Sequence, residues 1–171
     1  MYRIPFVVLL SSVLLIACAA PAQDSPSTSS ATCNFDQDKQ LMVEYQPVTV
    51  NLKKPLAGQV PFGKPWGPGG KPMTLFINTP VQVGPRMLPI GAYTMFLLPS
   101  SKQWTLIVSK ATDMSAAYNE QDDLVRVTMD SGELPNPETS LSVAFEHVSA
   151  GRCNLRVDLD KFGHFTAFQE K

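Results

Sequence analysis

Apolar and polar residues alternate with a period of two over much of the chain, and this pattern constrains the fold more than any other feature. Residues 41–46, 124–130 and 153–159 alternate in this way, and so do residues 140–148 and 164–170. Successive side chains of a β-strand point to opposite faces. The alternation therefore predicts strands with one face in a core and one face toward solvent.

Three other segments, residues 73–78, 92–98 and 104–109, are almost continuously apolar, as strands covered on both sides are. The chain has 15 prolines in 171 residues, and proline interrupts helices and central strands. Short strands that recur between turn-forming segments are typical of sandwiches and barrels. We therefore predict an all-β fold, either an antiparallel β-sandwich or a partly open β-barrel, with at most one short helix, at residues 111–123.

The first residues predict export. Residues 1–17 have one positive charge, Arg3, and then an apolar run. That run is too short for a bilayer crossing of about 20 residues but fits a signal peptide. It ends in LIAC at Cys18, which resembles the bacterial lipoprotein signal, in which the cysteine thiol receives a diacylglycerol. Ordinary cleavage after Ala22, in the sequence APA, is the alternative.

These features divide the chain into a signal peptide (1–17), a flexible tether rich in Ser, Pro and Ala (18–32) and one domain (33–171). Ala19 rather than Asp follows the cysteine, which resembles the default for outer-membrane lipoproteins. The expected location is the periplasmic face of the outer membrane, held by lipid on Cys18. Cleavage after Ala22 would instead leave a free periplasmic or secreted protein.

The three cysteines support the same interpretation, because an odd number leaves one thiol unpaired in an exported protein. If Cys18 is lipidated, Cys33 and Cys153 remain as a pair in an oxidising compartment. Cys153 shares a strand face with core positions, which suits an inward-facing disulfide. The alternative is two buried free thiols.

The strongest candidate for a ligand surface is the segment 60–73, VPFGKPWGPGGKPM. Phe62 and Trp66 offer flat apolar faces, and Lys64 and Lys71 offer positive charge for an anion. The competing interpretation is that Trp66 folds back and plugs one end of the sandwich. The segment lacks the order of residues that a phosphate-binding loop requires before a helix.

This segment also carries a resemblance to a family of exported bacterial proteins of unknown function, domain-of-unknown-function family 2911. Pro61-Phe62-Gly63 and Trp66 match its Pro-aromatic-Gly-x-x-Trp turn. The sequence LPIGAY at 88–93 and the strand WTLIV at 104–108 follow in the family's order. Cys33 and Cys153 lie where many members carry a pair.

The chain departs from the family pattern just after the tryptophan. Where the family has Arg, Asn and Glu, this chain has Gly67, Lys71 and Pro72. The resemblance implies that those three polar residues are the family's candidate cluster for a ligand or for catalysis, and only Lys71 could still contact an anion here.

The charges and the remaining motifs favour a binding role over catalysis. The chain has 14 Lys and Arg against 15 Asp and Glu, a net charge of −1, so no strong field attracts a nucleic acid. We predict no cofactor, metal site or catalytic residue. The expected function is a non-catalytic binding or scaffolding module of the bacterial cell envelope, whose candidate partners are a glycan, a peptide or an envelope protein.

The alternative function is a small envelope hydrolase or a metal-assisted enzyme. It would use Asp122 and Asp123 together with His147 or His164, the only two histidines. Ser131 lies in a predicted turn beside a single glycine, outside the Gly-x-Ser-x-Gly pattern of serine hydrolases.

The intact mass of the native product tests the N-terminal interpretation. We expect a chain that starts at an acylated Cys18 and lacks the two hydrogens that a Cys33–Cys153 disulfide removes. A mass that corresponds to an unmodified start at Gln23 would contradict the lipid anchor, and a mass with both hydrogens present would contradict the disulfide.

Overall fold

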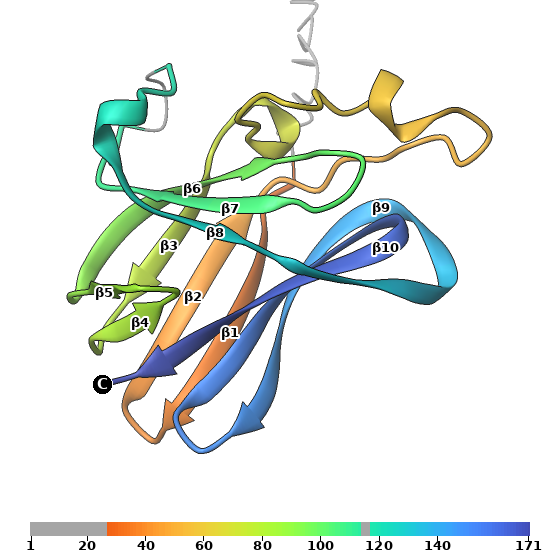
Figure 1. Ribbon diagram of the computed structural model, residues 1–171. Coiled ribbons are helices and arrows are strands. Elements are labelled where there is room, and N and C mark those ends of the chain that lie inside the picture. The colour runs from red at the N-terminus through yellow and green to blue at the C-terminus, as the bar shows by residue number, and fades with distance from the viewer. Residues whose placement is uncertain (1–26, 114–116) are drawn as a thin grey trace, which may run out of the picture.

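The computed structural model describes residues 27–113 and 117–171, which consist mainly of β-strands (Figure 1). The strands, in chain order, are β1 (Ser29–Asp36), β2 (Lys39–Tyr45), β3 (Met73–Ile77), β4 (Val81–Val83), β5 (Arg86–Leu88), β6 (Gly91–Leu98), β7 (Thr105–Ser109), β8 (Asp123–Thr128), β9 (Asp130–Ser149) and β10 (Arg152–Glu170). Single 3₁₀ turns are η1 (Leu56–Gly58), η2 (Pro68–Gly70) and η3 (Glu120–Asp122).

The strands form two antiparallel sheets that face each other. In the described part of the chain, one sheet has six strands in the order β1-β2-β3-β6-β7-β8 and the other has four in the order β5-β4-β10-β9. Neither order returns to its first strand, so the sheets form an open sandwich and not a closed barrel. This confirms the all-β prediction. Residues 111–123, a candidate for either a short helix or a long loop, form only the turn η3 and the first residue of β8 in their described part.

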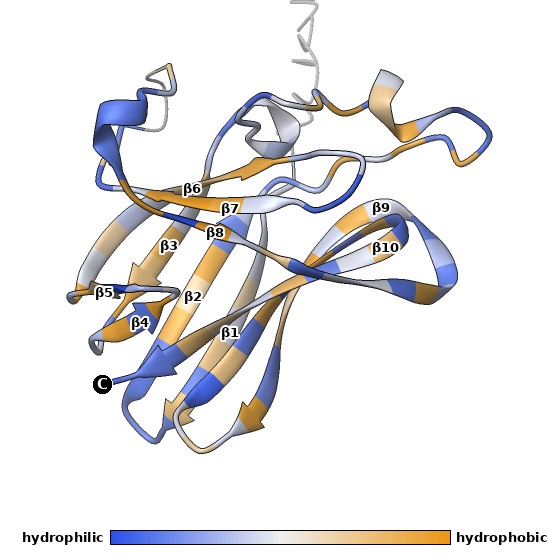
Figure 2. Ribbon diagram, in the orientation of Figure 1, coloured by the Kyte–Doolittle hydropathy of each residue, from blue (hydrophilic) through white to orange (hydrophobic). Residues whose placement is uncertain are grey.

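The core lies between the two sheets and follows the alternation in the sequence. Leu41 and Val43 of β2 are fully buried, and so are Leu155 and Val157 of β10, whereas their neighbours along each strand are partly or fully exposed. The central strands β6 and β7 are apolar along most of their length (Figure 2). Burial of a large aliphatic side chain contributes about 1.5–3 kcal/mol, so these paired faces hold the sheets together.

The last two predicted strands, 153–159 and 164–170, are in fact one continuous strand, β10. The register with β9 shifts between Asp158 and Asp160 and again between Asp160 and Phe162. Asp160 has a φ of 57°, in the left-handed region that non-glycine residues rarely adopt. The extra residues of this irregularity lie in β9, because Ser142 to Glu133 lie opposite Asp158 to Phe162. In β10 the inward-facing residues change from odd to even numbers around Asp160, and this reversal made the two halves look like separate strands.

Three other strands, β1, β4 and β5, were not predicted. The β4–β5 hairpin consists of three-residue strands, which are too short to show an alternation. Strand β1 begins at Ser29, so it includes the last residues of the segment expected to be tether. The predicted signal peptide and Cys18 lie outside the described residues. Within residues 27–113 and 117–171, no helix is long and apolar enough to cross a membrane.

The chain passes from one sheet to the other at Met129, between β8 and β9. Met129 is fully buried, and its backbone N–H donates to the carbonyl of Trp104 over 2.8 Å. From this point β9 and β10 form a long hairpin, and the last part of β10 crosses the sandwich to pair with β4 (Figure 1). The start of this hairpin therefore lies against the turn between β6 and β7.

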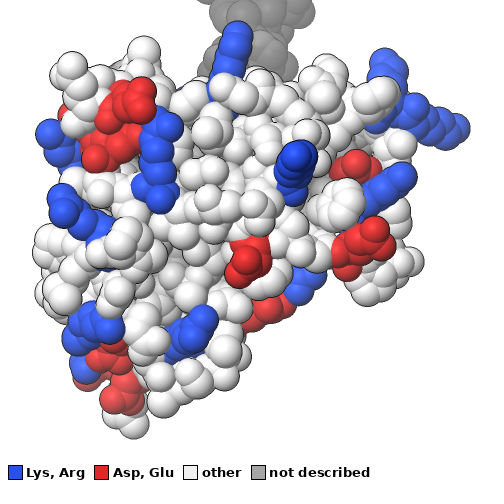
Figure 3. Space-filling view, in the orientation of Figure 1, with Lys and Arg blue, Asp and Glu red and all other residues white. Residues whose placement is uncertain are grey.

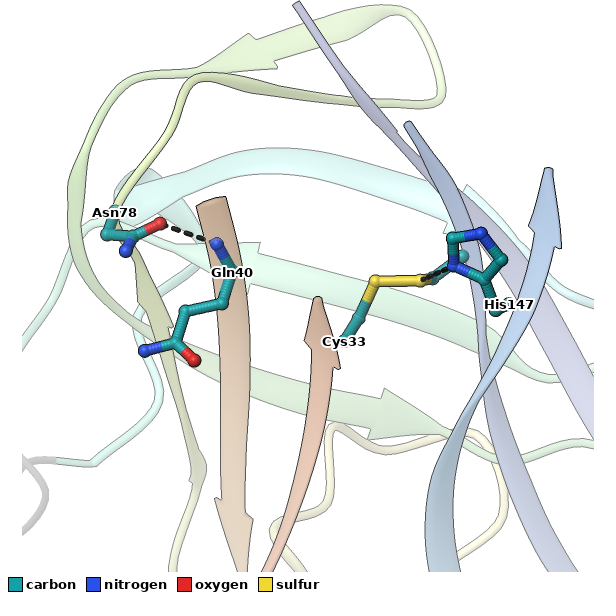
Figure 4. Close-up of a disulfide and its surroundings, with 5 residues drawn as sticks. Cys33, Gln40, Asn78 and His147 are labelled. Carbon is teal, nitrogen blue, oxygen red and sulfur yellow. Dashed lines mark hydrogen bonds between the residues drawn. A yellow bond between two sulfur atoms is a disulfide. The ribbon is translucent and has the colours of Figure 1, made fainter. Parts of the chain in front are cut away.

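A disulfide joins Cys33 in β1 to Cys153 in β10, and so it links the two sheets (Figure 4). Both cysteines are buried, with 2% and 1% of their surface exposed. The bond closes a sequence separation of 120 residues. The predicted pairing is therefore confirmed. His147 lies beside the bond, with Nδ1 3.8 Å from Cys153 Sγ.

Removal of the disulfide should destabilise the domain without changing its fold. We expect the double variant Cys33→Ser/Cys153→Ser to lose about 2–5 kcal/mol of unfolding free energy, because the unfolded chain regains the entropy of a long loop. Urea unfolding with and without dithiothreitol measures this loss. The reductant should destabilise the wild type and leave the double variant unchanged; equal stability of oxidised and reduced wild type would contradict the prediction.

Candidate functional site

A cavity of about 440 Å³ lies at one end of the sandwich, where three parts of the chain meet. The loop after β2 contributes Leu56 and Phe62, the turn before β7 contributes Lys102 and Trp104, and the β9–β10 hairpin contributes the remaining wall. The volume falls within the range of about 300–1,000 Å³ for small-molecule pockets. We call this space the end cavity.

The loop 60–73 is held as a structured turn against β6. Trp66 and Leu97 exchange two backbone hydrogen bonds of 2.7 and 2.9 Å, and Gly63 N–H donates to the carbonyl of Pro99. Gly69 has a φ of 72°, and a Cβ at Gly67 would lie only 2.1 Å from the carbonyl oxygen of Lys71. The glycines are therefore required by the path of the backbone.

Three aromatic rings pack one against the next at the wall of the end cavity. The edge of one tryptophan meets the face of the other, with the Trp66 and Trp104 centroids 6.2 Å apart and the rings 81° from parallel. His164 lies nearly parallel to Trp104, with centroids 4.4 Å apart and an angle of 14°. Trp104 is 1% exposed, so this stack fixes the position of the imidazole that lines the cavity.

His164 makes its hydrogen bond across the β9–β10 hairpin. Its Nδ1 lies 2.8 Å from Ser131 Oγ, on the residue directly opposite in the register. Burial lowers the pKa of His164 from its ordinary value of 6.5 to about 4, so the ring is neutral near neutral pH. A neutral imidazole both donates and accepts, and among the described residues nothing bonds to its Nε2. His164 can therefore bond to a ligand as well as to Ser131.

The structure separates the four residues predicted for ligand binding. Phe62 lines the end cavity. Trp66 is half-buried and supports Trp104 from behind. Lys64 and Lys71 are exposed, and neither lines the cavity.

Sequence reasoning did not find the pair Ser131–His164. An uninterrupted register counted from the Cys153–His147 pair would place Asn136 opposite His164. The register shifts in the hairpin place Ser131 there instead. The only signal in the sequence was a histidine in a strand of alternating residues, and it did not identify a partner 33 residues away.

The end cavity has an amphipathic lining. Leu56, Phe62 and Phe162 present apolar side chains to it. Phe162 is 41% exposed. Lys102, Glu133 and Asp160 add charges of both signs at the same cavity. The arrangement suits a small molecule with an apolar body and a polar head.

Asp122 and Asp123, the carboxylates predicted for the alternative enzyme, are bonded to other side chains. Asp123 accepts hydrogen bonds from Tyr118 Oη over 2.6 Å and from Arg126 Nε over 2.7 Å. Burial raises the pKa of Tyr118 to about 12, and the hydrogen bond to Asp123 is the second cause of this rise. Asp122 pairs with Lys110. In residues 27–113 and 117–171, no group of three or more His, Cys, Asp or Glu side chains could hold a metal ion.

The fold and the end cavity define a class: a disulfide-linked, two-sheet β-sandwich with a small amphipathic cavity at one end. The family is equally clear. Residues 25–164 match the family described as "Protein of unknown function (DUF2911)", and the chain belongs to this family. Comparison with curated proteins and with solved structures gave no significant match.

The buried His164 should make stability depend on pH. Between about pH 6.5 and pH 4 the unfolded chain protonates this histidine but the folded chain does not, so stability falls as pH falls through that window. At about pH 4.5 the loss should reach about 2–3 kcal/mol relative to neutral pH. Urea unfolding at both pH values should show a smaller loss in His164→Gln. Equal losses in the variant and the wild type would contradict the assignment.

Proposed function

We propose that this protein is a non-catalytic binding module that takes up a small amphipathic molecule in its end cavity. The cavity itself carries the proposal: it combines apolar walls from Leu56, Phe62 and Phe162 with the polar pair Ser131–His164. Ligand pockets usually show this combination of mainly apolar walls and a few fixed polar groups.

The polar head of the ligand would lie against His164 and Ser131. Because the imidazole is neutral, it can bond to a hydroxyl, an amide or a carboxyl group without requiring charge on the ligand. Lys102 at the same cavity favours a ligand with partial or full negative charge, and Glu133 and Asp160 oppose a strongly anionic one. The apolar body would lie against Phe62 and Phe162.

We further propose that the module acts in the bacterial cell envelope, anchored by lipid on Cys18. The apolar N-terminal segment that ends in LIAC supports export and lipidation, and the disulfide is typical of an oxidising compartment. Partners would then be an envelope glycan, peptide or protein. Acidic and basic side chains are interspersed on the face shown in Figure 3, which argues against a nucleic-acid partner.

One observation favours the competing function, a hydrolase. The exposed Ser131 Oγ lies 2.8 Å from Nδ1 of a neutral histidine. In such an enzyme the serine proton would pass to Nδ1 while Oγ attacks a carbonyl, and the leaving group would take that proton back. The absence of a carboxylate bonded to Nε2 among the described residues weakens this candidate, and so does the low pKa of His164.

Binding of apolar fluorescent probes tests the proposed function. We expect phenylnaphthylamine, which is neutral, and anilinonaphthalene sulfonate, which is anionic, to bind the wild type. Phe62→Ala should weaken binding about tenfold, because the probe loses apolar contact area. Phe76→Ala is the control, since it removes the same ring from β3, away from the end cavity; Phe76 is 38% exposed, whereas Phe62 is partly buried.

Fluorescence titration and the shift in melting temperature measure both variants. Equal weakening by Phe62→Ala and Phe76→Ala would contradict binding in the end cavity. Turnover of acyl esters that Ser131→Ala abolishes would favour the hydrolase instead.

A further inference from the structure

A second hollow lies on the outer face of the β9–β10 hairpin. Its volume is about 370 Å³, and its lining includes Glu146, Asn154, Arg156 and Phe165. Gly132 and Glu133 line both this space and the end cavity, whereas Glu146, Asn154, Arg156 and Phe165 line only this second space. We call this second space the outer hollow.

The reversal of alternation in β10 brings the outer hollow together. Before Asp160, the partly exposed Asn154 and Arg156 alternate with fully buried residues and so point outward. Beyond Asp160, His164 points into the sandwich and Phe165 points outward. The reversal therefore places the ring of Phe165 on the same face as the amide of Asn154 and the guanidinium of Arg156, although Phe165 has an odd residue number and the other two have even numbers.

A cross-strand pair of glycines forms the floor of the outer hollow. Gly132 lies directly opposite Gly163, so neither strand fills the space with a side chain. A Cβ at Gly163 would lie 2.4 Å from Asp158 Oδ1, on the outer face. Since directly opposite residues share a face, a side chain at Gly132 would also point outward, and there it would meet no atom within 4 Å.

The polar side chains of the outer hollow are held in fixed positions. Arg156 Nε donates to both carboxylate oxygens of Asp158, over 2.9 and 3.0 Å, and its Nη1 donates to Glu146 Oε1 over 2.5 Å. Among the described residues, nothing bonds to Arg156 Nη2. Asn154 Oδ1 is buried without a hydrogen-bond partner in the same part of the chain, so Arg156 Nη2 is the unused group that a ligand could reach.

The charges in the outer hollow oppose an anionic ligand. Glu133 and Glu146 border it, and Glu146 and Asp158 neutralise the guanidinium of Arg156, so a negative charge on the ligand would be repelled. A neutral molecule with several hydroxyl groups can both donate to the carboxylates and accept from Arg156. The half-buried ring of Phe165 offers a flat apolar surface for the C–H face of a pyranose ring.

We propose that the outer hollow binds a neutral saccharide, stacked on Phe165 and hydrogen-bonded to Arg156 and Glu146. The site adjoins the end cavity, with which it shares Gly132 and Glu133, but the proposal does not depend on the function proposed for that cavity.

Ligand-observed NMR on the purified full chain tests the site, with N,N′-diacetylchitobiose, maltose and cellobiose as neutral probes. Glucose and its anionic counterpart glucuronate serve as a pair of equal size that differs in charge. We expect at least one neutral disaccharide to bind with a dissociation constant of about 1 mM or somewhat above, a free energy of about −4 kcal/mol or slightly weaker. Glucuronate should bind more weakly than glucose.

Two variants locate the binding. Gly132→Val fills the hollow, and Phe165→Leu keeps an apolar side chain but removes the flat ring; each should weaken binding at least about tenfold. The control Ala92→Val adds comparable bulk at an exposed position of β6, in the other sheet, and should leave binding unchanged. Melting temperatures confirm that each variant is folded.

Three results would overturn the proposal. They are the absence of binding by all three neutral disaccharides, binding that survives Gly132→Val, and stronger binding of glucuronate than of glucose. Loss of saccharide binding in Phe62→Ala with retention in Phe165→Leu would assign the sugar to the end cavity instead.

Discussion

The reversal of side-chain alternation in β10 is the constraint on which the rest of this structure depends. Asp160 takes a left-handed φ of 57°, and the register with β9 shifts on both sides of it. Before this point Leu155 and Val157 fill the core, and beyond it His164 and Phe168 do. One irregular residue thus lets a single strand of 19 residues serve both ends of the sandwich and form a wall of both hollows.

Much of the fold follows from the sequence, because its main signal is local. Residues 41–46 and 92–98 show their strands directly, since alternation and continuous apolar runs report burial. The disulfide followed from an odd number of cysteines and an inward position of Cys153. The pairing of β9 with β10 could not be predicted, because register shifts arise from the whole hairpin and leave no periodic trace.

The candidate site was likewise predictable only in part. Phe62 was predicted from its loop and does line the end cavity. His164 and Ser131 were individually visible as a strand histidine and a turn serine. Their contact depends on the shifted register, and the position of the imidazole depends on Trp104, which stacks on it. Lys64 and Lys71 were predicted to contact an anion because they are cations on a glycine-rich turn. The composition of a loop, however, does not determine where its side chains point.

Thiol labelling of single cysteines placed along β10 tests the reversal of alternation most directly. Thr166 is 8% exposed and faces inward, whereas Ala167 next to it is partly exposed on the outer face. The account predicts that a thiol reagent labels Ala167→Cys rapidly and Thr166→Cys slowly in the folded protein, with the wild type as background. Faster labelling of Thr166→Cys than of Ala167→Cys would show that the alternation continues unbroken through Asp160, and it would contradict both proposed binding sites.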